Sequence, residues 1–222
     1  MEISNHSTTK KTNPCNSVNG LWPISLLPLP SKILEKIVYQ QCITHLNTYN
    51  YLDSDQYGFQ KNKSTITAIS ELTDDFFKSI EKKQATISIF IDFQKAFDKL
   101  DHKILLHKLQ FFGFSDSSIN FFQNYLSNRT QKTLVNNIQS NTLPLTHGIP
   151  QGSNLGPLLF LLYINDIGYS IKYSSLKLFA DDTTIYCSDA DITSCIKKLE
   201  SDLKGICEWC SNNNMALNTQ KN

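Results

Sequence analysis

Three aspartates interrupt apolar stretches of the sequence, and their placement suits metal-dependent chemistry. Asp92 lies near the end of the β-branched and aromatic run 86–93 (TISIFIDF), which predicts a buried strand. Asp181 and Asp182 stand between two further apolar runs, which predict strands joined directly at this pair. A carboxylate in such a context is costly unless it is paired, hydrogen-bonded or bound to a cation. If the strand end and the junction lie side by side, the three side chains converge on one point.

Converging carboxylates need a counter-charge, and oxygen ligands without histidine favour Mg²⁺ over Zn²⁺. The chemistry that suits such a site is two-metal phosphoryl transfer, in which one ion activates an attacking hydroxyl and both stabilise the in-line transition state. The alternative is that these aspartates form turns and caps, for which Asp is well suited. The turn interpretation is favoured for any one of them alone, whereas the three together favour the metal site.

Segment 148–157 (GIPQGSNLGP) is the second unusual feature, because it contains three Gly and two Pro in a predicted connection between a strand and a helix. Gly allows a backbone to approach a ligand closely. The helix that opens near Gly156 presents free N–H groups suited to phosphate or base contacts. An elaborate turn explains the segment equally well when it is taken by itself.

The sequence lacks the patterns of several other enzyme classes. No Ser/His/Asp or Cys/His arrangement indicates nucleophilic catalysis, and neither Gly-rich phosphate fingerprint is present. Six cysteines occur at irregular spacing without a secretory signal, which argues against disulfides. Cys207 and Cys210 form a CxxC in a run of helical periodicity, with no second pair to complete a zinc site, so buried thiols are favoured.

Composition indicates a globular protein, since 40% of the 222 residues are hydrophobic and 18% are charged. The longest apolar run, 158–164, is far shorter than the roughly 20 residues of a membrane span, and no signal pattern opens the chain. We therefore expect a soluble, intracellular protein that does not bind a membrane. The net charge of +1 counts weakly against a polynucleotide partner. Residues 1–20 are polar and predict a disordered leader, followed by a folded domain over 21–222.

Hydrophobic periodicity predicts alternating helices and strands along this domain. Helices are expected over 31–38, 65–80, 100–112, 117–126, 156–166 and 192–209, and strands over 86–93, 132–138, 143–145, 176–180 and 183–187.

The unusual segments also match a known family, in the order of three polymerase motifs: 90–98 (FIDFQKAFD), 148–153 (GIPQGS) and 179–182 (FADD). Further matching segments are 23–28 (PISLLP), 31–35 (SKILE), 56–59 (QYGF), 64–65, 125–129 (YLSNR), 155–166 (LGPLLFLLYIND), Asn218 and Lys221. From about residue 21 to its end, the chain resembles the reverse transcriptase of LINE-type, non-LTR retrotransposons of the jockey-like group. A lone Asp-Asp pair is a weak signal, but this ordered set is highly specific.

The resemblance implies an α+β fold, a right-hand polymerase with fingers and with a palm whose ferredoxin-like antiparallel sheet packs on helices. It implies an RNA-directed DNA polymerase that transfers dNTPs onto the 3′-OH of a DNA primer along an RNA template. Asp92, Asp181 and Asp182 would be the catalytic carboxylates that hold two Mg²⁺ ions, with Mn²⁺ as a substitute ion.

Further residues would contact the incoming nucleotide by the same resemblance. Phe97 falls five positions after Asp92, where an aromatic ring would collide with a ribose 2′-OH and so select deoxynucleotides. The alternative for Phe97 is a core aromatic residue. Phe93, Gln151 and Gly152 would also lie beside the nucleotide.

At the end of the chain, Lys221 would lie near the pyrophosphate leaving group as a general acid. Two positions depart from the family pattern, because Trp22 and Gln60 stand where the family usually has Arg. Arg in the fingers is expected to bind triphosphate oxygens bidentately, and Gln cannot replace its charge. Lys61 or Lys63 would compensate as point charges.

The sequence ends one residue after Lys221, before the primer-gripping segment and thumb of the family, so we expect the thumb to be absent and template–primer to be held poorly. Two other interpretations stay open. One is a truncated, catalytically silent remnant that at most binds RNA. The other is a viral RNA-dependent RNA polymerase, which Phe97 and the FADD form of the last motif disfavour.

Overall fold

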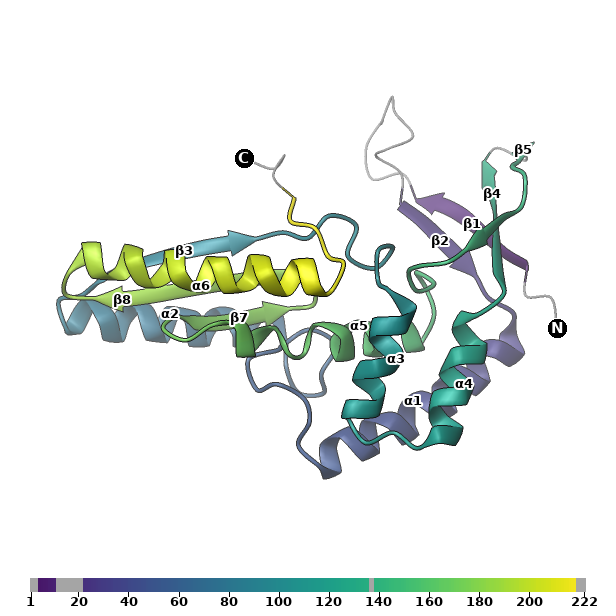
Figure 1. Ribbon diagram of the computed structural model, residues 1–222, viewed down its shortest axis with the longest axis horizontal. Coiled ribbons are helices and arrows are strands. Elements are labelled where there is room, and N and C mark those ends of the chain that lie inside the picture. Colours follow the sequence, from purple (N-terminus) through teal and green to yellow (C-terminus); the bar gives the residue numbers. More distant parts are fainter. Residues whose placement is uncertain (1–3, 11–21, 136–137, 219–222) are drawn as a thin grey trace. The chain divides into compact units, whose positions relative to one another are not determined.

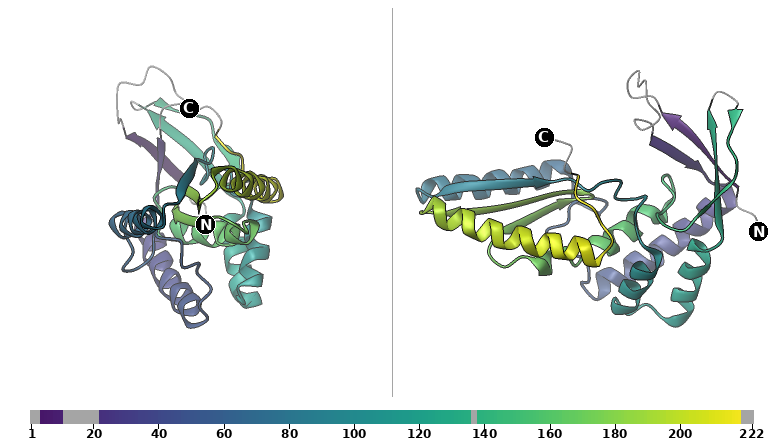
Figure 2. Two further views of the ribbon diagram at one scale, coloured as in Figure 1. Left: turned by 90° about the vertical axis from the view of Figure 1, so that its left-hand side faces the viewer. Right: turned by 45° about the horizontal axis from the view of Figure 1, so that its top comes forward.

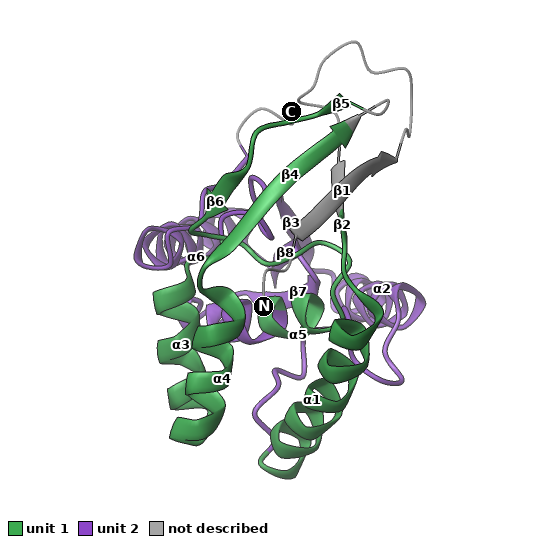
Figure 3. Cartoon of the chain, turned by 90° about the vertical axis from the view of Figure 1, so that its right-hand side faces the viewer, with its two compact units in different colours: residues 1–49, 100–160 green, residues 50–99, 161–222 purple. Residues whose placement is uncertain are grey.

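The computed structural model describes residues 4–10, 22–135 and 138–218 (Figure 1). The chain forms two compact units (Figure 3). Unit 1 contains residues 1–49 and 100–160, and unit 2 contains residues 50–99 and 161–222.

The sheet of unit 1 is built from five strands: β1 (Ser4–Lys10), β2 (Trp22–Leu26), β4 (Arg129–Val135), β5 (Ile138–Gln139) and β6 (Leu143–Leu145). Strand β1 pairs antiparallel with β2 and parallel with β4. We expected a disordered leader here, and the structure differs because the backbone groups of Ser4–Lys10 have partners on both sides of the strand. The rest of the expected leader, residues 11–20, lies outside the described residues.

Three helices complete most of unit 1: α1 (Leu29–Thr48), α3 (His102–Phe111) and α4 (Asp116–Leu126). Helix α1 begins two residues before Ser31, because a proline early in the first turn has a preset φ and needs no N–H partner. Side-chain oxygens of Asp101 and Ser115 accept bonds from the first turns of α3 and α4 and so fix where these helices start. Leu46, Leu105 and Phe122 are among the side chains buried in this unit.

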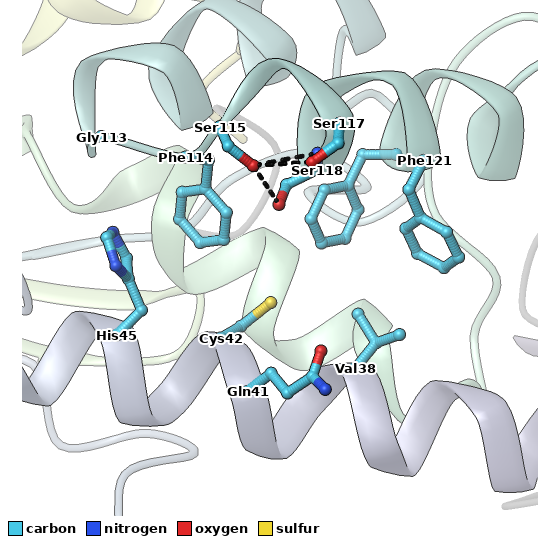
Figure 4. A pocket seen from close by; sticks show the side chains of 11 residues that line it. Val38, Gln41, Cys42, His45, Gly113, Phe114, Ser115, Ser117, Ser118 and Phe121 are labelled. Carbon is cyan, nitrogen blue, oxygen red and sulfur yellow. Dashed lines mark hydrogen bonds between the residues drawn. The ribbon is translucent and has the colours of Figure 1, made fainter.

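A cavity of about 410 Å³ lies between α1 and the α3–α4 pair in unit 1 (Figure 4). Val38 and Phe121 form apolar walls, and Cys42 and His45 come from α1. Burial raises the pKa of the Cys42 thiol to about 11, so this thiol is protonated at neutral pH. None of the residues expected at the catalytic or nucleotide site lines this cavity.

Helix α5 (Leu155–Ile164) follows segment 148–154 and is apolar around its whole circumference. Such a helix is expected to be buried, and most of its residues are almost completely inaccessible to solvent. Among the described residues, no helix is both long enough and apolar enough to cross a membrane.

Unit 2 contains a three-stranded antiparallel sheet in the order β3 (Ala85–Ile91), β8 (Asp182–Asp189), β7 (Ser175–Phe179). Helices α2 (Thr65–Glu81) and α6 (Ile192–Asn212) cover opposite faces of this sheet (Figure 2). A short 3₁₀ helix, η2 (Ile167–Ser170), precedes β7.

Side chains on β8 alternate between the two helices, as the two-residue period of a strand requires. On one face, Tyr186 packs edge-on against Phe76 of α2, and the hydroxyl of Ser79 donates to Ser188. On the other face, Cys195 of α6 donates to the carbonyl oxygen of Cys187, and Ile185 is fully buried. The expected strands and helices of this unit are therefore present, with ends that differ from the expected ones by a few residues.

Candidate active site

The ends of two neighbouring strands bring the three predicted aspartates to the same edge of the unit 2 sheet. The last residue pair between β3 and β8 is Ile91 with Thr183, so Asp92 follows directly on the side where Asp182 begins β8. In the hairpin of β7 and β8, Phe179 pairs with Asp182. The register, set by the apolar alternation of the strands, thus places these backbone positions side by side.

Two residues, Ala180 and Asp181, connect β7 to β8. Ala180 has a φ of +56°, which lies in the left-handed region that a residue with a Cβ rarely occupies. A tight two-residue hairpin loop requires such a backbone, because its twist must match the twist of the strands. Asp181 is half-buried and Asp182 is exposed.

The carboxylate of Asp92 is held by Asn218. The side-chain Nδ2 of Asn218 donates to Oδ2 of Asp92 at 2.8 Å, and its backbone N–H donates to the carbonyl oxygen of Asp92, also at 2.8 Å. Neighbouring backbone bonds extend this contact, since Phe93 forms a bridge with Leu217. Sequence reasoning named Asn218 only as a motif match, and its contact with Asp92 was not anticipated.

Among the described residues, no three His, Cys, Asp or Glu side chains lie together as a ready-made metal cluster. Ionised carboxylates repel one another without a counter-charge, and the Asp92 carboxylate accepts a bond from a neutral amide instead. The donor set still fits a hard divalent cation, because the strand ends offer carboxylate oxygens and no nitrogen or sulfur ligand. The assignment of Asp92, Asp181 and Asp182 as metal ligands stays a prediction.

Two phenylalanines after Asp92 have different surroundings. Phe93 is 3% exposed and its ring lies 6.3 Å from that of Trp209, so its side chain belongs to the core, and its expected place beside the nucleotide stays a prediction. Phe97 is half-buried, and its ring meets Phe59 edge-on at 6.4 Å. The contact with Phe59 holds the Phe97 ring in place from a second segment of the chain.

The two lysines expected to replace a missing arginine are not equivalent. The Nζ of Lys63 donates to the carbonyl oxygens of Ser54 and Gln56, and it lies 4.9 Å from the centre of the Tyr57 ring. Burial lowers the pKa of Lys63. Lys61, in contrast, is exposed, and its ammonium bonds to none of the described residues.

Gln60, which stands where the family has Arg, donates to the carbonyl oxygen of Asp53 at 3.3 Å. Of the two lysines beside it, Lys61 is therefore the cation available to a phosphate, while Lys63 already bonds to the backbone of its own segment.

An ion-pair network centred on the largely buried Lys177 lies beside this segment and was not anticipated from the sequence. Nζ of Lys177 on β7 lies 2.8 Å from Asp55, 3.1 Å from the Tyr57 hydroxyl and 3.2 Å from Glu71. Burial by itself would lower the pKa of Lys177, but these bonds outweigh burial and raise the pKa well above its usual range. Lys177 is therefore a fixed positive charge that ties the segment to β7.

In unit 1, segment 148–154 is anchored at several points. The carbonyl oxygen of Gln151 accepts from the N–H of Ser25 at 2.8 Å, and Gly152 has a φ of +102° that favours glycine. The Ser153 hydroxyl accepts from the N–H of Gly156 and so occupies a free donor at the start of α5. Gln151 is half-buried and Gly152 is exposed.

A buried carboxylate connects two of the matching segments in unit 1, 31–35 and 125–129, to segment 148–154. Glu35 is 2% exposed, and it accepts from the hydroxyl of Tyr125 at 2.9 Å and from the N–H of Asn154 at 2.7 Å. Burial and the nearby Glu35 raise the pKa of Tyr125 well above its usual range, which keeps the hydroxyl protonated as a donor. The only arginine, Arg129, lies over the Tyr125 ring at 5.5 Å.

One expected site residue lies outside the described part of the chain. Lys221, the expected general acid, falls among residues 219–222.

Comparison with known proteins identifies the family. Residues 9–222 match the family described as reverse transcriptase (RNA-dependent DNA polymerase). The RNA-directed DNA polymerase from the mobile element jockey of Drosophila melanogaster is 26% identical over 223 residues, which cover 97% of this chain and 24% of the relative. The probable RNA-directed DNA polymerase from transposon BS of the same fly is 28% identical over 219 residues, 96% of this chain and 24% of the relative. The chain thus spans about a quarter of the length of these relatives.

Solved structures show the fold. Apo telomerase from Candida tropicalis has a TM-score of 0.71 at 13% identity, over 99% of this chain and 44% of that chain. Telomerase from Candida albicans in complex with a fragment of telomeric RNA has a TM-score of 0.61 at 12% identity, over 100% of this chain and 42% of that chain. The expected α+β polymerase fold and the expected likeness to non-LTR retrotransposon polymerases are confirmed. This chain belongs to the reverse transcriptase (RNA-dependent DNA polymerase) family.

Proposed function

We propose that this chain is the fingers and palm of an RNA-directed DNA polymerase that transfers deoxynucleotides onto a primer 3′-OH along an RNA template. The register that puts Asp92 beside the Asp181–Asp182 hairpin carries the proposal. Family membership and the names of the fly relatives support it.

Asp92, Asp181 and Asp182 would hold divalent cations, Mg²⁺ with Mn²⁺ as a substitute. Such ions, when bound, supply the positive charge that activates a hydroxyl and stabilises the phosphoryl-transfer transition state. The role of Asn218 is to keep one Asp92 oxygen in a fixed direction. The loop of Ala180 fixes the directions in which the next two carboxylates leave the backbone.

The remaining residues would bind and select the nucleotide. The Phe97 ring, held by Phe59, would exclude a ribose 2′-OH. Gln151 and Gly152 would contact the nucleotide, and the exposed ammonium of Lys61 would attract its phosphates. Lys221 would donate a proton to the pyrophosphate.

Primer extension tests the proposal. The purified chain is given an RNA template, a DNA primer, dNTPs and Mg²⁺, and Asp181→Ala is compared with Asp74→Ala, which removes an exposed carboxylate on α2. We expect extension by the parent and by Asp74→Ala, and none by Asp181→Ala. Equal extension by Asp181→Ala contradicts the proposal, and inactivity of all three proteins supports the silent remnant that at most binds RNA.

A further inference from the structure

A short segment of unit 2 lies alongside β7, just before the hairpin that carries two of the aspartates. The N–H of Tyr57 donates to the carbonyl oxygen of Leu178 at 2.7 Å, and the N–H of Leu178 donates to the carbonyl oxygen of Asp55 at 2.9 Å. Gln56 thereby forms a parallel bridge with Leu178. The segment is thus attached to the sheet at the β7 edge by a single bridge.

The side chain of Gln56 reaches beyond this bridge to the hairpin loop. Gln56 is 2% exposed, and its Oε1 accepts two backbone bonds, from Gly58 at 2.7 Å and from Ala180 at 3.0 Å. One buried oxygen therefore joins the two segments. Ala180 is the residue with φ of +56° that directly precedes Asp181 and Asp182.

Gly58 makes this close contact sterically possible. A Cβ at Gly58 would overlap the backbone nitrogen of Ala180 and lie 2.9 Å from its Cα. Only a residue without a side chain allows the two backbones to approach so closely.

The amide group of Gln56 is also only partly satisfied by hydrogen bonds. Its Nε2 is buried without a hydrogen-bond partner among the described residues. An unpaired buried donor is unfavourable, and an apolar side chain of similar shape would remove that cost. What an apolar side chain lacks is the acceptor for the N–H groups of Gly58 and Ala180.

We propose that Gln56 is a positioning residue for the catalytic hairpin: its amide oxygen fixes the Ala180 turn and so aims Asp181 and Asp182. Gln56 touches neither carboxylate in this role and acts through the Ala180 backbone. The link to catalysis rests on the proposed function, whereas the effect on the turn does not.

The first test measures hydrogen exchange of the Ala180 amide by NMR in the folded chain. Gln56→Met keeps the size of the side chain and removes the acceptor, and Gln56→Glu keeps the acceptor. Gln84→Met is the matched control, because Gln84 directly precedes β3, at the end of that strand far from Asp92. We expect at least about tenfold faster Ala180 exchange in Gln56→Met, and exchange close to that of the parent in Gln56→Glu and Gln84→Met.

Unchanged Ala180 exchange in Gln56→Met overturns the proposal, and so does equal acceleration in Gln84→Met. Should Gln56→Met not fold, Gln56→Asn decides by the same measurement, since its shorter amide no longer spans both N–H groups.

The second test measures primer extension as a function of Mg²⁺ concentration. We expect Gln56→Met to need at least about tenfold more Mg²⁺ for half-maximal extension, with the KM for dNTP unchanged and with Gln84→Met giving the parent response. Faster exchange with an unaltered Mg²⁺ response overturns the positioning role. Inactivity of the parent chain contradicts the proposed function. The exchange measurement then decides by itself whether Gln56 fixes the turn.

Discussion

Asn218 donates two hydrogen bonds to Asp92, one from its side-chain amide to the carboxylate and one from its backbone N–H to the carbonyl oxygen. The two residues lie 126 positions apart in the sequence. A carboxylate oxygen bonded in this way keeps one direction. If Asp92 binds a metal ion, as proposed, Asn218 would orient the carboxylate that holds the ion.

Removal of the Asn218 side-chain amide is expected to slow catalysis, because it releases the Asp92 carboxylate from its fixed direction. Hydrogen bonds to charged groups contribute about 1.5–3 kcal/mol, so Asn218→Ala should lower kcat for primer extension about tenfold or more. The KM for dNTP should not change, because the amide holds Asp92 and not the nucleotide. Steady-state primer extension measures both constants, with Asn212→Ala at the exposed end of α6 as the control. A raised KM with normal kcat would show that Asn218 acts elsewhere.

Replacement of Phe97 by a smaller residue is expected to admit ribonucleotides. Phe97→Val removes the ring that Phe59 holds edge-on, so a 2′-OH no longer meets it. A change of this size in a shaped pocket is expected to alter the preference for dNTP over rNTP roughly 10- to 200-fold. The ratio of kcat/KM for dNTP and rNTP measures it, and Phe111→Val, at an exposed phenylalanine of α3, is the control. An unchanged ratio would assign Phe97 to the core alone.

The two neighbouring lysines should give opposite phenotypes. Lys61→Ala is expected to raise the KM for dNTP several-fold and to leave Tm unchanged, because the Lys61 ammonium is exposed. Lys63→Ala should lower Tm, because the Lys63 ammonium bonds to the Ser54 and Gln56 carbonyls. Thermal unfolding and steady-state kinetics on both variants separate the effects. If Lys63→Ala raises KM at constant Tm, the assignment of the two residues is reversed.

Asp202 on α6 is expected to make stability depend on pH. Its buried carboxylate accepts from the N–H groups of Lys172, Tyr173 and Ser174 just before β7. Burial by itself would raise the pKa of Asp202, but these bonds outweigh burial and lower it. A lowered folded-state pKa means that the stabilisation is complete above the unfolded-state pKa of about 3.9 and is lost as pH falls through the folded-state value.

Asp202→Asn should therefore cost about 1–3 kcal/mol of unfolding free energy at pH 7 and less at pH 3. Urea unfolding at both pH values measures the difference, with Asp74→Asn as the control. An equal cost at both pH values would mean that the charge of Asp202 plays no part.

Local patterns in the sequence predicted much of this fold, because local chemistry decides those parts. Ser64 and Thr67 form a reciprocal capping box at the start of α2, and this helix begins where the pattern placed it. The β-branched run that became β3 was recognisable for the same reason, since its residues suit a pleated buried surface. Strand β1 was missed because its polar residues form a strand only through pairing with β2 and β4.

The sequence predicted the three aspartates, whose role as metal ligands stays a prediction, but it did not predict the contacts that position them. Asp92 and the Asp181–Asp182 pair were recognised because charge interrupts apolar strands there. Gln56 and Ala180 lie 124 positions apart, and no local pattern links an amide to a backbone N–H at that distance. The segment 56–59 could be recognised only as a family match, which did not indicate what its glutamine contacts. Long-range contacts of this kind become visible only in the folded chain.

Binding of Mn²⁺ to the chain, in the presence of a dNTP, tests most directly whether Asp92 and the hairpin aspartates share divalent cations. Titration followed by electron paramagnetic resonance gives the affinity for the parent, Asp92→Asn, Asp181→Asn and the control Asp74→Asn. We predict that either active-site substitution weakens Mn²⁺ binding at least about tenfold, that the double variant binds little worse than the singles, and that Asp74→Asn binds like the parent. Full Mn²⁺ affinity in Asp92→Asn would contradict a shared site.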